Sequence, residues 1–455
     1  MILADVLWAL GMGLLGAIVF AAIGLVSGTD ETSTLAPITL LVVLLGVPPA
    51  GVLTFFIAGA VAKHMTHAIP TTLLGIPGDT TAVPLLDDAT ALRRLGAPHI
   101  ALRKALAGGF LAALISVPIA VGVASLLAPL AETITSVAPY VFVVAAAFVA
   151  YFSPGRWASV VAIVPFALLV SALNGLASDQ LGSSLSISFF LGIAIGPLVV
   201  DLLLTSSRSG RDMLPRSGTR TVWLAPDVGT GSRWWPNPLR VLNRRQATTT
   251  VVAAGATSTT FMLSPVAATV LTGEIVGSRI KHPYQRLSTL MAVKNGTTES
   301  TYLAEALIPL VAFGLPLSPV AAGPASPLFN APPVYTVEGE GGVHNLHTLL
   351  SSWEFLVFSL AGVLLAGLIA YPFAMRYARA ASAWVSRTIS HEALIGAFVA
   401  LIAVVSWYEG GLLGFVISVT VGAVGGLANK FLGMTSGVQF MAFYVAVLFL
   451  PLLLG

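Results

Sequence analysis

The chain has 455 residues, of which 56% are hydrophobic and only 9% are charged. Soluble globular domains carry about 25% charged residues, so this composition predicts a polytopic membrane protein. The formal net charge of +3 is too small to indicate a nucleic-acid partner, and the absence of cysteine excludes disulfides, cysteine-bound metals and thiol catalysis.

The apolar runs predict a series of transmembrane helices. The first run, residues 5–27, has no Lys or Arg before it, unlike a cleaved signal peptide, and we expect it to be retained. A hydroxyl-rich break with Thr32 and Ser33 separates it from a second run at 38–62. Further spans are predicted at 105–129, 139–152, 157–174, 186–204, 354–375, 393–407, 411–429 and 434–454. The predicted fold class is an all-α polytopic membrane protein with about 10–12 spans.

The longest polar stretch, residues 205–249, lies near the middle of the chain and holds eight Arg and two Asp. By the positive-inside rule we place it in the cytoplasm, as a linker between a first half (1–204) and a second half (250–455). Its Arg residues with Trp234 and Trp235 could also bind anionic lipid headgroups. The alternative interpretation is a simple determinant of topology.

A nine-residue pattern occurs once in each half, at Ile69–Pro77 and Ile308–Pro316. Each copy reads Ile-Pro, four residues, Gly, Ile or Leu, and Pro, which predicts an interrupted helix. Irregular backbone survives in a membrane only where protein encloses it or it lines a cavity, and matched interruptions mark the binding sites of transporters. We therefore expect Gly75 and Gly314 to lie near the bilayer midplane at one shared cavity. Two unrelated proline kinks are the alternative.

The basic loops predict opposite orientations for the two copies. If the basic loops are cytoplasmic, the first copy runs towards the loop at 93–104 and the second runs away from the stretch at 279–286. Residues 250–278 must then enter and leave on one side, as a re-entrant hairpin. These features together predict inverted-topology repeats with discontinuous helices, the arrangement that serves alternating access.

Residues around the interruptions are the candidate substrate ligands, because half-helix N-termini attract anions. They are Gly75, Pro77, Gly78, Thr80, Thr81, Gly314, Pro316 and Ser318, with the hydroxyl residues Thr257 and Ser258. Lys63 and Lys294 could pair with substrate carboxylates. Their alternative role is to extend along the apolar surface towards the membrane interface.

Carboxylate, hydroxyl and amide oxygens suit a coupling cation, either Na⁺ or H⁺. The candidates are Asp79, Thr32, Ser33, Asn295, Thr297 and Glu299. Asp79, Glu299 and Glu305 are ionisable residues in or near apolar sequence, which makes each a functional candidate. Asp79 could instead cap a helix, and Glu299 could be a solvated residue at the membrane edge.

Other chemistry is not indicated. His64 and His67 are three residues apart, but no further ligand set accompanies them, so we predict no metal site. No nucleophile–base arrangement and no nucleotide-binding motif occurs, so we expect neither an enzyme nor a chain that uses ATP itself, and no cofactor beyond the coupling ion.

Two stretches resemble a known family. Leu74–Val83, followed by Leu86, Asp87 and Gly96, resembles the signature of the large membrane subunit (TctA-type) of tripartite tricarboxylate transporters, and Glu299-Ser300 with Ile308–Pro316 resembles its partner motif. The resemblance implies cation-coupled uptake of citrate-like carboxylates, a small membrane subunit and a periplasmic solute-binding protein. The sequence departs from the family pattern at Thr301–Leu303 and at Leu317.

We therefore predict a multi-pass secondary transporter of the cytoplasmic membrane that moves an organic anion by alternating access. The alternative is a translocase (flippase) for a lipid-linked anion, such as a polyprenyl phosphate or an envelope glycolipid, because the same inverted fold could open sideways to lipid. The sequence also leaves a homodimer open.

Overall fold

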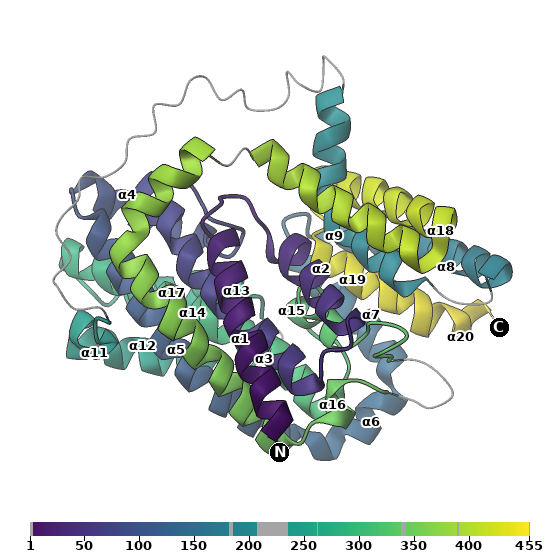
Figure 1. The fold of residues 1–455 in the computed structure, drawn as a ribbon, viewed down its shortest axis with the longest axis horizontal. Coiled ribbons are helices and arrows are strands. Elements are labelled where there is room, and N and C mark those ends of the chain that lie inside the picture. The colour runs from purple at the N-terminus through teal and green to yellow at the C-terminus, as the bar shows by residue number, and fades with distance from the viewer. Residues whose placement is uncertain are drawn as a thin grey trace.

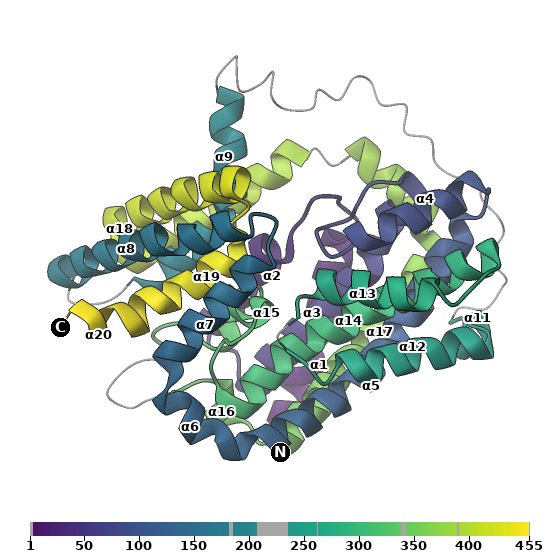
Figure 2. The same cartoon turned by 180° about the vertical axis from the view of Figure 1, so that it is seen from behind.

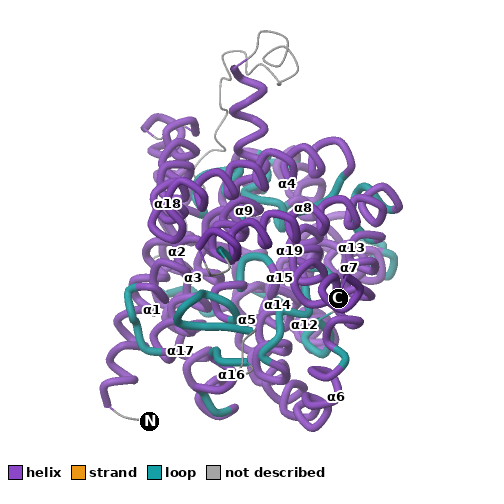
Figure 3. The backbone as a smooth tube through the Cα atoms, turned by 90° about the vertical axis from the view of Figure 1, so that its right-hand side faces the viewer, coloured by secondary structure: helices purple, strands orange, loops and turns teal. Residues whose placement is uncertain are grey.

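The structure is a computed structural model that describes residues 3–181, 185–206, 235–261, 263–337, 343–388 and 391–454. These residues form helices and loops, and the only β pairing among them is two isolated bridges between 331 and 344 (Figures 1 and 3). The predicted all-α class is confirmed. Residues 207–234 lie outside the described ranges, and with them most of the predicted basic linker and its proposed lipid contacts.

The helices of the first half are α1 (Leu3–Ile23), α2 (Glu31–Leu44), α3 (Pro49–Ile69), the π-helical turn η1 (Pro70–Leu74), η2 (Val83–Leu85), α4 (Leu86–Arg94), α5 (Pro98–Leu127), η3 (Ala128–Leu130), α6 (Ala131–Ser136), α7 (Ala138–Tyr151), α8 (Trp157–Leu181) and α9 (Ser186–Ser206). Those that follow are α11 (Pro238–Val241), α12 (Arg244–Thr257), α13 (Pro265–Gly277), α14 (Pro283–Phe313), α15 (Pro319–Ala322), η4 (Ser326–Leu328), α16 (Leu346–Leu349), α17 (Ser352–Thr388), α18 (His391–Leu432), α19 (Ser436–Tyr444), η5 (Val445–Phe449) and α20 (Leu450–Leu454).

Seven helical segments in the described part are long and apolar enough to cross a membrane. They support the predicted polytopic membrane protein. Four further apolar helices are shorter, among them α2 and α13, with 14 and 13 residues. A bilayer crossing needs about 20 helical residues, so α12 and α13 have the lengths expected for a re-entrant hairpin. The side of the membrane from which they enter stays a prediction.

The helices form two bundles (Figures 1 and 2). The first bundle contains α1, α3, α5, α12, α13, α14 and α17, and the second contains α7, α8, α9, α18, α19 and α20. Helix α2 contacts α3 of the first bundle and α9 and α18 of the second, and the short α15 lies between α14 and α19. The connection between the bundles is therefore made by short elements that follow breaks in the chain.

The opening helices of the two halves repeat one plan. A helix is followed by a turn, a capped short helix and a long helix that begins with proline. Asp30 caps α2 through the Thr32 amide, and Ser264 caps α13 through the Ala267 amide. Helices α3 and α14 start at Pro49 and Pro283, so the offset for both the caps and the starts is 234 residues. Proline is favoured at the first helical position because that amide has no partner within the helix.

The sequence predicts an interruption within each motif, and the structure places it at the glycine, with the first proline still in helical backbone. Pro70 begins the π-helical turn η1, and Pro309 lies inside α14. The chain ends both helices at residues with left-handed backbone, Gly75 (φ +70°) and Gly314 (φ +65°). Glycine adopts this conformation without the Cβ clash of other residues.

A hydroxyl group that follows the break replaces the hydrogen bond that Pro309 removes from α14. The missing Pro309 amide leaves the carbonyl of Glu305, four residues earlier, without its helical partner. The Ser318 hydroxyl donates to that carbonyl at 2.7 Å. A buried side chain thus restores the hydrogen bond, as is required where no water is present.

One predicted span differs in the structure, and one predicted division between spans agrees with it. The apolar run 38–62 is two helices, because Pro49 starts α3 and does not kink a continuous helix. Within α18 the backbone leaves helical geometry at Gly410 and Gly411. In a straight helix, residues 406 and 414 would be about 12 Å apart along the axis. In the structure, a Cβ added to Gly414 would lie only 2.4 Å from the Ser406 carbonyl oxygen. Helix α18 therefore turns back at the glycine pair, between the two spans predicted there.

Arg156, in the turn between α7 and α8, allows a test of backbone strain. It is exposed and has φ +47°, a left-handed conformation in which an L side chain is strained. We expect Arg156→Gly to stabilise the protein by about 1 kcal/mol, seen as a higher thermal unfolding midpoint in detergent. Arg156→Ala removes the same charge but keeps the Cβ atom. An equal gain in both variants would contradict the strain.

Candidate functional site

Six ionisable side chains from both halves lie together in the interior. We call them the charged network: Glu31, Lys63, His64, His67, Asp79 and Glu299. Each is at most 5% exposed. They come from α2, α3, the loop after the first motif and α14, so the network joins the two repeated units. Buried charges require opposite charges and hydrogen bonds nearby, which makes their geometry informative.

Local structure brings the first-half residues together. Lys63 and His67 lie four residues apart on α3 and share a face of that helix. Glu31 is the first residue of α2, directly after its cap. The loop reaches His67 through Gly78, where an added Cβ would lie only 2.5 Å from the His67 carbonyl oxygen. Only glycine permits this close approach.

The Lys63 ammonium is bound between two carboxylates. Its Nζ lies 3.1 Å from Glu31 Oε1 and 2.9 Å from Asp79 Oδ2, and the side chain has no solvent exposure. Such a charge is tolerated only when both its partners and its hydrogen bonds are supplied. Lys63 therefore ties the start of α2 to the loop after the first motif.

Asp79 uses its two oxygens for different purposes. Oδ1 accepts from the amides of Thr81 (3.0 Å) and Ala82 (3.1 Å) and from the Thr81 hydroxyl (2.8 Å), which caps the following turn. Oδ2 accepts from Lys63 and lies 2.7 Å from His67 Nδ1. The sequence left capping and coupling-ion binding as alternatives. The carboxylate performs the capping and also accepts from an ammonium, and a role in ion coupling stays a prediction.

His64 connects the two halves. Its Nδ1 lies 3.0 Å from Glu299 Oε2, and its Nε2 lies 3.3 Å from Glu31 Oε1 without the alignment of a hydrogen bond. A protonated imidazole has a donor for each carboxylate. Glu299 is 2% exposed, so the alternative of a solvated residue is wrong.

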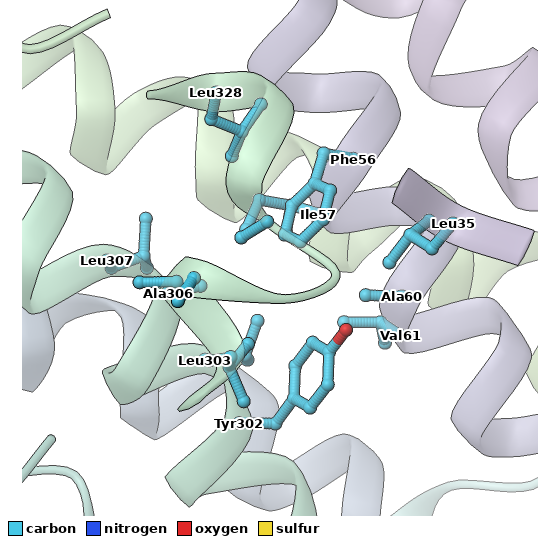
Figure 4. Close-up of a cluster of buried hydrophobic side chains, with 14 of the residues drawn as sticks. Leu35, Phe56, Ile57, Ala60, Val61, Tyr302, Leu303, Ala306, Leu307 and Leu328 are labelled. Atoms are coloured by element: carbon cyan, nitrogen blue, oxygen red, sulfur yellow. The ribbon is translucent and has the colours of Figure 1, made fainter. Parts of the chain in front are cut away.

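Tyr302 also belongs to this region, although the sequence gave no signal for it beyond its departure from the family pattern. Its ring packs edge-on against His64, with centroids 4.5 Å apart, and it projects from α14 towards α3 (Figure 4). The Tyr302 hydroxyl, Glu299 Oε1 and His67 Nε2 are buried and have no hydrogen-bond partner among the described residues. These atoms are available to a polar ligand.

The two motif loops differ in accessibility. Gly75 and Pro77 are half-buried and Thr80 is exposed, whereas Gly314, Pro316 and Ser318 are buried. Beside the first motif, Arg93 of α4 donates to the Leu74 carbonyl at 2.6 Å. A guanidinium is thus present at the accessible break.

A family model described as the tripartite tricarboxylate transporter TctA family matches residues 10–435. The chain belongs to the TctA family. This confirms the resemblance predicted from the two motifs and makes the chain a subunit of a membrane transporter. Comparisons with curated proteins and with solved structures give no match.

Several predicted ligands in this TctA-family chain take part in helix packing. Thr257 bonds Ser300 at 2.7 Å, Thr297 accepts from Thr272 at 3.1 Å, and Asn295 donates to the Ala105 carbonyl at 2.9 Å. These contacts fix α14 against α12, α13 and α5. Such interhelical bonds are typical of polar residues in membranes. Any role of these residues in binding substrate or ion stays a prediction.

The remaining candidates lie apart from the charged network or support it from outside. Lys294 contacts Asp88 and donates to the Pro84 carbonyl at 2.9 Å, which ties α14 to α4. Ser258 donates to its own helix at Ala254. The amide of Thr32 and the hydroxyl of Ser33 bond Asp30 in the cap of α2. Thr80 donates to Asp30 from the first motif loop, at 2.9 Å.

The second motif has its own buried carboxyl group, Glu305. It is fully buried, and Oε2 accepts from the Val320 amide at 3.1 Å. Oε1 has no hydrogen-bond partner in the described part of the chain. The sequence signal was present, because an ionisable residue in apolar sequence is a functional candidate by default.

Among the described residues, one group of side chains has the spacing of a metal site. Glu31, His67 and Asp79 each bring one polar atom to within 4.8 Å of the others, which is a spacing that one ion could bridge. The Lys63 ammonium already contacts two of these three side chains.

Asp79→Asn separates the two roles of Asp79, which are capping the turn and binding Lys63. Asparagine retains the oxygen that caps the turn but leaves Lys63 with one carboxylate, so we expect a loss of about 3 kcal/mol in unfolding free energy. Asp88→Asn is the control, because the Asp88–Lys294 pair retains 12–15% exposure, against none for Lys63 and Asp79. Thermal unfolding of the purified variants measures both, and equal losses would speak against the buried pair.

Gly78→Ala tests the contact between the loop and α3. The new methyl group would meet the His67 carbonyl, and overpacking of this kind costs about 1–3 kcal/mol. Gly122→Ala in α5 is the control, because nothing lies within 4 Å of its added Cβ. We expect the control to unfold at the same temperature or higher. A Gly78→Ala variant as stable as the control would show that the loop is not packed on His67.

Proposed function

We propose that the chain forms the transport path for a small organic carboxylate across the cytoplasmic membrane, by alternating access coupled to a cation gradient. Membership of the TctA family establishes a transporter subunit. The substrate class, the coupling and the membrane are the proposed part. By the same family, the partners would be a small membrane subunit and a solute-binding protein.

The opposite accessibility of the two motif loops carries this proposal. The motifs are equivalent in sequence and both end a long helix at a left-handed glycine. One loop is nevertheless half-exposed and the other is buried. An alternating-access protein in a single conformation is expected to have one repeat accessible and its counterpart closed.

The chemistry of the accessible loop favours an anion with carboxylate groups. Arg93 lies directly beside Gly75, since an added Cβ there would be 2.6 Å from its Nη1. Guanidinium groups bind carboxylates through paired hydrogen bonds. Polar groups of Thr80 and the half-buried backbone from Gly75 to Pro77 are close in sequence to this position. We propose that the substrate carboxylate binds there.

Uptake of ¹⁴C-labelled citrate and of a panel of labelled dicarboxylates tests the proposal. The assay uses cells that express the chain with its partner subunits, and cells without the chain are the control. Uptake of at least one carboxylate that depends on the chain and collapses with the cation gradient is expected. If no carboxylate is taken up and the purified chain instead moves polyprenyl phosphate between vesicle leaflets, the translocase replaces this function.

Arg93→Gln should raise the KM for the carboxylate by about 10–100-fold, because a charge-assisted hydrogen bond contributes about 1.5–3 kcal/mol. Arg93→Lys keeps the charge and should lose less. Arg94→Gln is the matched control, because Arg94 is the next residue of α4 and is exposed. Thermal unfolding separates loss of binding from loss of fold. An unchanged KM in folded Arg93→Gln protein would remove Arg93 from the site.

A further inference from the structure

We propose that Lys63 determines the ion specificity of the protein. Its ammonium is a covalently held cation in the place where a coupling Na⁺ would bind, so Na⁺ does not bind there. Removal of the ammonium would create a Na⁺ site. The consequence for transport rests on the proposed function, but the binding chemistry does not.

The surroundings of Lys63 Nζ are those of a cation site. Two carboxylate oxygens from separate elements, Glu31 on α2 and Asp79 after the first motif, lie 3.1 and 2.9 Å from it. Hard cations such as Ca²⁺ take carboxylate, carbonyl and hydroxyl oxygens as ligands, and the same oxygens suit Na⁺. The polar atoms of Glu31, Asp79 and His67 lie within 4.8 Å of one another, close enough to surround a single ion.

A second observation is a buried polar atom without a partner on one of these side chains. His67 is 1% exposed, and its Nε2 has no hydrogen-bond partner in the described ranges. Its other nitrogen is held by Asp79 at 2.7 Å. The side chains around the ammonium therefore include a buried polar atom with no hydrogen bond to Lys63 or to any other described residue.

Charge balance explains why the ammonium is required. The network contains three carboxylates, from Glu31, Asp79 and Glu299, which face Lys63, His64 and His67. Among the described residues, Tyr302 of α14 also packs against this network, and Asp30 adjoins Glu31. Lys63 is the permanent cation of this set. In its absence, Glu31 and Asp79 would face each other in the dry interior and would need an exchangeable cation.

The Lys63 ammonium is fixed to the chain, whereas a bound Na⁺ would exchange with solution. A site filled by Na⁺ couples movement of α2 against the first motif loop to the Na⁺ gradient, because the ion must enter and leave. A site filled by Lys63 keeps the same two elements together without an ion from solution. We therefore infer that the wild-type protein does not use Na⁺ at this position.

Thermal unfolding in NaCl and in choline chloride at equal ionic strength tests the inference without any transport assay. Wild-type protein should unfold at the same temperature in both salts. Lys63→Met should be less stable in choline chloride and should regain stability as the logarithm of the Na⁺ concentration rises. Lys294→Met is the control, because Lys294 is a partly exposed lysine with a single carboxylate partner, and it should not respond to Na⁺. Binding of ²²Na⁺ to the same proteins gives a direct readout.

A second variant covers the case in which Lys63→Met does not fold in either salt. Lys63→Gln removes the charge but keeps an amide that can donate to one of the two carboxylates, so it leaves both carboxylates in place and should gain Na⁺ binding. Folded variants without Lys63 that bind no more ²²Na⁺ than wild type would overturn the inference. So would wild-type protein whose Na⁺ binding is lost in Asp79→Asn.

Transport gives an independent outcome. Uptake by the wild type should be equal in Na⁺ and choline buffers. If no carboxylate is transported but the Na⁺ response of Lys63→Met is found, the ion site stands and only the proposed function fails. If uptake by the wild type requires Na⁺ and Asp79→Asn abolishes that requirement, the ion assignment fails and the transporter stands.

Discussion

The Lys63 ammonium has no contact with solvent, and a charge in that position persists only while opposite charges remain within hydrogen-bond distance. This requirement fixes the start of α2, the middle of α3 and the loop after the first motif relative to one another. His64 extends the same constraint to α14 through Glu299. The repeated units are therefore joined by electrostatics, whereas apolar packing and hydrogen bonds between neighbouring helices hold the rest of the first bundle.

Features that depend on neighbouring residues were predictable from the sequence. The glycine of each motif ends its helix because only glycine takes a left-handed backbone without strain, and this is a local property. The caps at Asp30 and Ser264 are local in the same way. The exact position of the break was not predictable from the prolines. A distant hydroxyl, that of Ser318, replaces the hydrogen bond that Pro309 removes.

Contacts between distant residues could not be predicted from the sequence. His64 and Glu299 are 235 residues apart, and no spacing rule connects them. From the sequence alone, Lys63 cannot be distinguished from a lysine that extends to the membrane interface. Its burial depends on the two carboxylates that contact it in the folded chain. Thr257 resembles a substrate ligand and Thr297 an ion ligand, but hydroxyl groups also bond neighbouring helices, and in this fold they do. The composition of a segment does not distinguish these two uses.

Long helices of each half pack against long helices of the other half. Helix α3 of the first half packs on α17 of the second, and α14 of the second half packs on α5 of the first. At the second of these contacts the backbones approach closely, since a Cβ on Gly108 would collide with the Ala292 carbonyl and one on Gly296 would lie 3.2 Å from the Gly108 carbonyl. A half-length chain would leave uncovered the face of its motif helix that packs on the other half, although α1 would still contact α3 and α12 and α13 would still contact α14. Two such chains could form this core only as an interlocked pair, each covering the other's motif helix. The covalent connection between the halves keeps these helices at high effective concentration, so assembly of the core does not depend on the concentration of the protein in the membrane.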